Sequence, residues 1–276
     1  MYVIAHINPL LIVDGDVIAH QYTVTGLVKE DESSILWRCE DIETEKGVAL
    51  KFHKNQHSFN REMNILKQFN HHNIIELIEL YPSNEQNEWH PYQLCVIPVC
   101  GSTLDDEYHH SRPVNVREVR RMTRMMVDVL DVLQQHGVVH CDITPSNITQ
   151  FDGYDEHGQW KLIGFDRACY VGEAVEHGTL EYCAPEAYQQ ASASYSMDMF
   201  SVGRIMMWMS INDYSMWPDI PSNSTQQQFL LSEQEFTLTN IDDEATREIV
   251  QRLIKKKPQD RLTLEALKHT TLIAMD

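Results

Sequence analysis

The sequence predicts an α+β protein in which a small β-rich N-terminal lobe, about residues 18–100, precedes a larger, mainly helical C-terminal lobe, residues 101–276. Strand-like runs come first and amphipathic helical runs come later, a segregation typical of α+β proteins. Gly101-Ser102 interrupts the pattern where one kind of element gives way to the other. The 276 residues are compatible with a single domain, 1–276, that contains both lobes.

The N-terminal lobe is predicted from short β-rich runs separated by turn-like segments. A helix over Ser58–Phe69 is expected among them, because apolar residues recur in it three or four positions apart. The predicted strands are Gln21–Thr25, Ser34–Cys39, Gly47–Phe52, Ile74–Leu80 and Gln93–Val99.

The C-terminal lobe is predicted from longer helical patterns. Val116–Gln135 carries apolar residues along one face, and Gly137 is expected to cap its C-terminal end. A second helix is expected over Asp243–Lys257, because Pro258 cannot continue it. Pro221–Gln228 is polar and is predicted to be a loop or an insertion.

Composition and charge limit the classes of function. The net charge of −19 argues against nucleic-acid binding, because a phosphate backbone would be repelled. A basic protein partner and a merely solubilising acidic surface both fit this charge. No apolar run reaches the roughly 20 residues of a membrane helix. The six cysteines include no C-x-x-C pair, and the first residues do not read as a signal peptide, so we expect an intracellular protein, cytoplasmic or nuclear, with reduced thiols.

The stretch 138–148 contains the most informative motif of the chain. An apolar pair leads into His140, Asp142 comes two residues later, and Asn147 follows five residues after the acid. This layout resembles the catalytic loop of protein kinases, H-R-D-L-x-x-x-N. The resemblance implies that Asp142 accepts the proton of a substrate hydroxyl and that Asn147 binds a magnesium ion.

Other positions near this loop depart from the family. Cys141 stands where many members have an Arg that binds an activation-loop phosphate, and Thr144 stands where they have a Lys that steadies the transferred phosphoryl group. From Gly164 to the residue before Thr179, Tyr170 is the one hydroxyl residue of the sequence. The usual phosphorylation switch is therefore expected to be absent.

Five further segments resemble protein-kinase elements and occur in the family's order. They are Val48–Lys51, Arg61–Leu66, Gly178–Glu186, Ser196–Gly203 and Arg261. The resemblance implies a two-lobed protein-kinase-like fold in which Lys51 holds the α- and β-phosphates of ATP and pairs with Glu62. It also implies an ion pair between Arg261 and Glu186. Gly178–Glu186 reads G-T-x-x-Y-x-A-P-E, which favours protein kinases over small-molecule kinases and the Ser/Thr branch over the Tyr branch.

The family's glycine-rich loop is replaced by an acidic turn. The glycine positions fall on Lys29, Asp31 and Ser34. Glycines are needed there because backbone N–H groups must approach phosphates without Cβ atoms in the way. The turn instead carries Glu30, Asp31 and Glu32, whose carboxylates repel a triphosphate. We therefore expect this loop to hold phosphate weakly or not at all.

The segment Lys161–Ala168 resembles K-L-I-D-F-G-L-A with the acid and the glycine exchanged. Gly164 supplies no ligand to magnesium, which binds through carboxylate and phosphate oxygens. Asp166 has a carboxylate, but it lies two residues, roughly 6.6 Å, further along an extended chain. It could replace the missing acid only if the backbone slid, and the flanking apolar residues fit the unslipped register better.

Two functions follow as hypotheses. The first is a pseudokinase, impaired in phosphoryl transfer, that acts in signalling as a scaffold or allosteric partner and retains at most weak ATP binding through Lys51. The second is an active, divergent Ser/Thr protein kinase that transfers the γ-phosphate of ATP to protein hydroxyls. In that case Asp142 is the base, Asn147 and a shifted Asp166 hold Mg²⁺, and Lys51 with Glu62 clamps the phosphates. A small-molecule kinase is a third hypothesis. Purely structural roles also remain open: Lys51 as the ion-pair partner of Glu62, and Asp142 and Asn147 as anchors of their loop.

Overall fold

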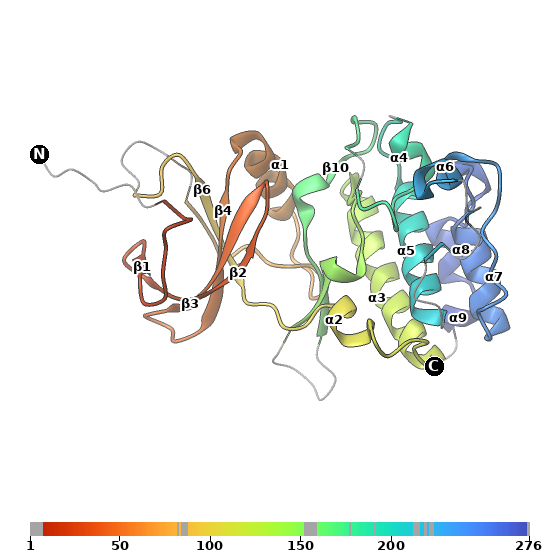
Figure 1. Ribbon diagram of the computed structural model, residues 1–276, viewed down its shortest axis with the longest axis horizontal. Coiled ribbons are helices and arrows are strands. Elements are labelled where there is room, and N and C mark those ends of the chain that lie inside the picture. Colours follow the sequence, from red (N-terminus) through yellow and green to blue (C-terminus); the bar gives the residue numbers. More distant parts are fainter. Residues whose placement is uncertain are drawn as a thin grey trace, which may run out of the picture. The chain divides into compact units, whose positions relative to one another are not determined.

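The computed structural model describes residues 8–81, 83, 88–151, 159–176, 178–189, 191–211, 216–217, 220 and 224–274. The chain divides into two compact units, the first made of residues 1–71 and 75–100 and the second of residues 72–74 and 101–276. Strands dominate the described part of the first unit, and helices dominate that of the second (Figure 1). This segregation confirms the predicted α+β fold class, with a β-rich N-terminal part and a mainly helical C-terminal part.

The first unit is built on an antiparallel sheet in the order β1-β2-β3-β4-β6-β5. Its strands are β1 Val17–Ile18, β2 Tyr22–Glu30, β3 Ser34–Asp41, β4 Gly47–His53, β5 Glu79–Tyr81 and β6 Gln93–Pro98. Buried and more exposed positions alternate along β3, so that Ile35, Trp37 and Cys39 enter one core. Trp37 donates its indole N–H to the carbonyl of Pro9, which ties the segment before β1 to this core.

Helix α1, Gln56–Leu66, follows β4. The Asn55 side chain accepts the N–H groups of His57 and Ser58, and this N-cap starts the helix two residues before the predicted Ser58. The helix ends at Leu66 rather than at the predicted Phe69, because the chain tightens there: the N–H of Phe69 bonds to the carbonyl of Leu66, three residues back.

The prediction of one strand over Ile74–Leu80 is wrong for most of its length. Only its last two residues pair within the sheet, in β5. Ile74 instead forms a single bridge with Leu162, and both Ile74 and Ile75 are buried. The apolar run therefore combines a buried start, Ile74-Ile75, with a more exposed remainder in which Ile78 is 49% exposed, rather than one continuous ladder.

The second unit contains helices and two short ladders in its described residues. The helices are α2 Leu104–Tyr108, α3 Val116–Gln135, α4 Pro185–Tyr188, α5 Tyr195–Ser210, α6 Gln226–Leu231, α7 Glu244–Leu253, α8 Leu264–Lys268 and α9 Thr271–Ala274. The ladders pair β7 Val138–Val139 with β10 Cys169–Tyr170, and β8 Ile148–Phe151 with β9 Gln159–Leu162. Within the ranges given above, no helix has both the length and the apolar character that crossing a bilayer requires.

The boundaries of three helices test the sequence predictions. Helix α3 spans Val116–Gln135 as predicted, and Gly137 follows it with a φ of +71°. Helix α7 begins after the Asp243 cap but ends at Leu253, four residues before the predicted end. Helix α6 begins inside the predicted loop Pro221–Gln228, because Thr225 and Gln228 form a capping box; residues 221–223 lie outside the described part.

Helix α5 is buried on nearly all sides and approaches α7 closely at Gly203. A Cβ atom at Gly203 would lie 2.6 Å from the Cβ of Leu253 and 2.8 Å from Cγ2 of Ile254. Such distances are too short for real carbon–carbon contacts, so a larger residue forces the two helices apart.

We therefore expect Gly203→Ala to lower the free energy of unfolding by about 1–2 kcal/mol, because the cost of overpacking exceeds the roughly 1 kcal/mol by which alanine favours a helix. Urea unfolding followed by circular dichroism measures the change. The control is Gly26→Ala in β2, where a Cβ would meet nothing within 4 Å. A Gly203→Ala protein as stable as the wild type would contradict the close approach of α5 and α7.

Candidate active site

Lys51 and Glu62 form an ion pair inside the first unit. Lys51 lies on β4 and Glu62 on α1, and the Lys51 Nζ atom is 2.9 Å from both carboxylate oxygens of Glu62. The side chains are only 14% and 5% exposed. The structure thus brings together the two residues to which the family resemblance assigns the phosphate clamp, in a setting where neither charge is well solvated.

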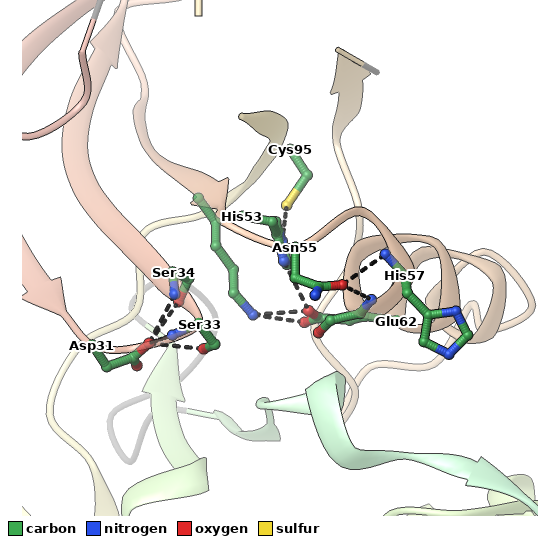
Figure 2. A network of polar contacts seen from close by, with 10 residues as sticks. Asp31, Ser33, Ser34, His53, Asn55, His57, Glu62 and Cys95 are labelled. Atoms are coloured by element: carbon green, nitrogen blue, oxygen red, sulfur yellow. Dashed lines mark hydrogen bonds and ion pairs between the residues drawn. The ribbon is translucent and has the colours of Figure 1, made fainter. Parts of the chain in front are cut away.

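His53 and Cys95 extend this pair into a network (Figure 2). The His53 Nδ1 atom is 3.7 Å from Glu62 Oε2, and His53 Nε2 is 3.6 Å from the Cys95 sulfur. Burial, followed by the nearby positive charge of Lys51, lowers the pKa of His53 to about 2, so its imidazole is neutral. Burial raises the pKa of Cys95 to about 12, so its thiol keeps its proton. The neutral tautomer that satisfies both neighbours carries hydrogen on Nδ1, toward Glu62, and accepts the Cys95 S–H at Nε2.

The acidic turn between β2 and β3 satisfies its own backbone. Asp31 Oδ1 accepts the N–H groups of Ser33 and Ser34 at 2.9 and 2.8 Å and the Ser33 hydroxyl at 2.7 Å (Figure 2). Lys29 Nζ lies 2.9 Å from Asp31 Oδ2. Burial raises the pKa of Asp31, but hydrogen bonds from Lys29 and the two serines outweigh it and hold this pKa well below its usual range. The N–H groups that could face a phosphate are thus occupied by a carboxylate of the turn itself.

In the second unit, helix α5 holds two loops through buried polar side chains. Asp198 accepts the N–H groups of His140 and Cys141 at 2.8 and 3.0 Å. Arg204 donates its Nε hydrogen to the carbonyl of Glu181 at 2.7 Å. Burial lowers the pKa of Arg204 to about 9. Helix α5 therefore fixes the backbone just before Asp142 and the backbone that follows Thr179.

Asp142 is oriented by the segment that these contacts anchor. Its Oδ1 atom accepts both the N–H and the hydroxyl of Thr179, each at 2.9 Å. Its Oδ2 atom lies 3.8 Å from the Nε atom of Arg167, and its side chain is 15% exposed. A Cβ at Gly178 would lie 2.6 Å from Asp142 Oδ1, so this approach requires glycine. The Asp142 carboxylate is thus held in a fixed orientation as a hydrogen-bond acceptor, with the positive charge of Arg167 close to its second oxygen.

Asn147 and Gly164 meet at the position where the family keeps a magnesium site. Asn147 donates its side-chain N–H to the carbonyl of Asp142 at 2.8 Å. Gly164 has a φ of +78°, and a Cβ there would lie 2.6 Å from Asn147 Oδ1. The β8–β9 ladder pairs Ile148 with Leu162 and so fixes this register. Asp166 lies two residues beyond Gly164, in a turn of 3₁₀ helix, Phe165–Arg167.

These residues do not fit a magnesium ion bound in the family's usual way. Magnesium in such sites is bound by one or two carboxylates together with phosphate and water oxygens. The residue beside the Asn147 side chain is Gly164, which has no carboxylate to offer. Over the described ranges, no group of three or more His, Cys, Asp or Glu side chains could hold a metal ion. Metal binding by Asn147 with Asp166 stays a prediction.

Three site residues outside the predicted set became visible only in three dimensions. Arg167 contacts the predicted Asp142, His53 contacts the predicted Glu62, and Cys95 joins the network through His53. The one available signal was the spacing of Lys51 and His53, because residues two apart on a strand share a face. Thr144, predicted from the loop motif, is buried, and its carbonyl accepts the N–H of Asn147 at 3.0 Å.

Comparisons with known proteins agree with the motifs. Residues 29–273 match the protein kinase domain family. Human death-associated protein kinase 2 is 24% identical over 266 residues, which cover 93% of this chain and 70% of that protein. Mouse calcium/calmodulin-dependent protein kinase type IV is 25% identical over 275 residues, or 93% of this chain and 56% of that protein. A probable myosin light chain kinase of Dictyostelium discoideum is 31% identical over 176 residues, or 59% of this chain and 43% of that protein.

Proposed function

The chain belongs to the protein kinase family, and from that membership we propose that it is a pseudokinase, a protein-kinase-like domain impaired in phosphoryl transfer that acts in signalling as a scaffold or allosteric partner of other proteins. The observation that carries this proposal is the contact between Gly164 and Asn147. The family places a carboxylate for magnesium at this position, whereas here the Asn147 side chain fills the space that a Cβ would need.

The acidic turn supports the same proposal. Asp31 occupies the N–H groups of Ser33 and Ser34 and adds a negative charge where the family has glycines. Carboxylates 4 Å from a phosphate cost about 1 kcal/mol per pair of charges even in water. Without a magnesium ion to neutralise it, a triphosphate would meet this repulsion in full.

A residual nucleotide site is compatible with the Lys51–Glu62 pair. Glu62 holds the Lys51 ammonium in place. A fixed ammonium can bind phosphate oxygens without a metal ion. We therefore propose weak, magnesium-independent binding of ATP through Lys51.

The alternative function is an active, divergent Ser/Thr protein kinase. The observation that favours it is the oriented Asp142 carboxylate, which accepts two hydrogen bonds from Thr179 and could accept a hydroxyl proton. Asn147 and Asp166 would then have to bind Mg²⁺, and Arg167 would have to leave Asp142 accessible.

Thermal unfolding with ATP separates the two proposals. If binding is independent of magnesium, ATP at tenfold excess over its Kd stabilises the protein by about 1.4 kcal/mol, and Tm rises by several degrees to the same value with and without magnesium. The rise should vanish in Lys51→Ala and persist in Lys46→Ala, which replaces an exposed lysine between β3 and β4. Each variant is compared with its own ligand-free Tm, because removing Lys51 also leaves Glu62 unpaired.

A phosphoryl-transfer assay decides the matter independently. The pseudokinase should transfer no label from ATP to a generic acceptor protein or to itself. Magnesium-dependent labelling that Asp142→Asn abolishes would refute the proposal and establish the active kinase in its place.

A further inference from the structure

Two buried cysteines meet where the loop that carries Asp142 approaches the segment after Gly164. The sulfur atoms of Cys141 and Cys169 are 3.6 Å apart. Both residues are buried, with 6% and 2% of their surface exposed. The β7–β10 ladder brings them together, because Cys169 pairs with Val139, two residues before Cys141.

We propose that Cys141 and Cys169 are a site of reversible oxidation at which a peroxide converts the two thiols into a disulfide bond. A disulfide has a sulfur–sulfur distance of about 2.05 Å, so the sulfurs must close by about 1.5 Å from their present separation. Rotation of the two side chains can supply this movement while the ladder keeps the backbones in register. The proposal holds whether or not the chain transfers phosphate.

The chemistry balances with hydrogen peroxide as the oxidant. One thiolate attacks a peroxide oxygen, the O–O bond breaks, and a sulfenic acid and water result. The second thiol attacks the sulfenic sulfur, the S–S bond forms, and the sulfenic oxygen leaves as a second water. The thiols lose two protons and two electrons in total, and the peroxide takes them up to give two molecules of water.

The surroundings determine how fast this occurs. Only the thiolate reacts, and the contact with Cys169 together with burial raises the pKa of Cys141. Oxidation should therefore be slow and should require the segment around β10 to open briefly. The same burial shields the finished disulfide from reductants, so the oxidised state should persist.

A Cys141–Cys169 disulfide would fix the position of the segment that follows Gly164. Cys141 stands where the family resemblance implies an Arg that binds an activation-loop phosphate, and Tyr170 is the one hydroxyl residue of the sequence between Gly164 and Thr179. A Cys141–Cys169 disulfide would join the same loop to the same segment by a covalent bond. In this chain, oxidation would thus replace phosphorylation as the means of fixing that segment beside Asp142.

The test is peptide mapping of the purified full chain after treatment with hydrogen peroxide and alkylation of remaining thiols. We expect a cross-linked peptide that contains Cys141 and Cys169 and is lighter than the sum of its parts by two hydrogen atoms. We also expect Tm to rise by about 5–10 °C, because the bond closes a loop of nearly thirty residues. After the protein is unfolded, reduced and refolded, Tm should return to its starting value.

Variants assign the bond. Cys183→Ala removes a third buried cysteine and should leave both the cross-linked peptide and the rise in Tm intact. Cys169→Ala should abolish both. Recovery of Cys141 as an alkylated or singly oxidised thiol after complete oxidation of the sample, or its pairing with another cysteine, would overturn the proposal. The map of the wild-type chain decides this even if Cys169→Ala does not fold.

Discussion

Replacing Arg261 with methionine should lower the free energy of unfolding by about 3–5 kcal/mol, the cost of removing one partner of a buried ion pair. Arg261 Nη1 contacts Glu186 Oε1, and Arg261 Nη2 lies 2.7 Å from Glu186 Oε2. The Arg261 side chain is 1% exposed. Methionine fills much of the same volume but leaves the Glu186 carboxylate buried without its guanidinium.

The loss extends beyond the ion pair. Arg261 also donates to the carbonyls of Ser196 and Lys256, each at 3.0 Å, and its guanidinium lies over the ring of Phe200 at 4.9 Å. These contacts connect the chain after α7 to the start of α5 and, through Glu186, to α4. The variant should therefore lose stability cooperatively across the second unit rather than at one exposed loop.

Urea unfolding monitored by circular dichroism measures the effect. The matched control is Arg252→Met on α7. The Arg252 side chain is 48% exposed and its Nη1 atom lies 4.0 Å from Glu248 Oε1, so the loss of stability should stay within about 0.5 kcal/mol. Combining Arg261→Met with Glu186→Leu should recover part of the stability, because the unpaired carboxylate is then removed. Equal losses for Arg261→Met and Arg252→Met would contradict the buried pair.

The fold could be predicted where a sequence pattern repeats over several turns. Helix α3 has its predicted bounds, because its apolar residues recur at helical spacing over its whole length and bury one face. Helix α6, Gln226–Leu231, is too short for such spacing, and its start depends on one capping box. In the run Ile74–Leu80, Ile74 and Ile75 are buried outside the six-stranded sheet and only the last two residues pair in β5, an arrangement that apolar spacing alone does not distinguish from one strand.

The site could be predicted only in part, for a different reason. Motif spacing identified Lys51, Glu62 and Asp142, and these lie in the contacts described above. The contact of Arg167 with Asp142 changes the interpretation of that carboxylate, yet it joins residues 25 positions apart that no local pattern connects. The turn at Asp31 is the opposite case: an Asp with serines two and three residues later is a local signal for a side chain that accepts hydrogen bonds from its own turn.

Acid should destabilise the protein through His53, by about 3 kcal/mol at pH 4.5. Burial, then Lys51, lowers the pKa of this base from 6.5 to about 2, although Asp31 acts weakly in the opposite direction. Between these two values the unfolded chain binds a proton that the folded chain does not bind. This contribution to stability is therefore intact above pH 6.5 and falls by about 1.36 kcal/mol for each pH unit below it.

His53→Gln isolates this effect, because glutamine can still hydrogen-bond toward Glu62 and Cys95 but does not titrate. Its free energy of unfolding, measured in urea from pH 7.5 to 4.5, should fall with acid by about 3 kcal/mol less than that of the wild type. His57→Gln, the same substitution at an exposed position of α1, is measured beside it as the matched control. If His53→Gln and the wild type lose stability in parallel, His53 is not held neutral, and the Lys51–Glu62 pair is then more solvated than the network around it implies.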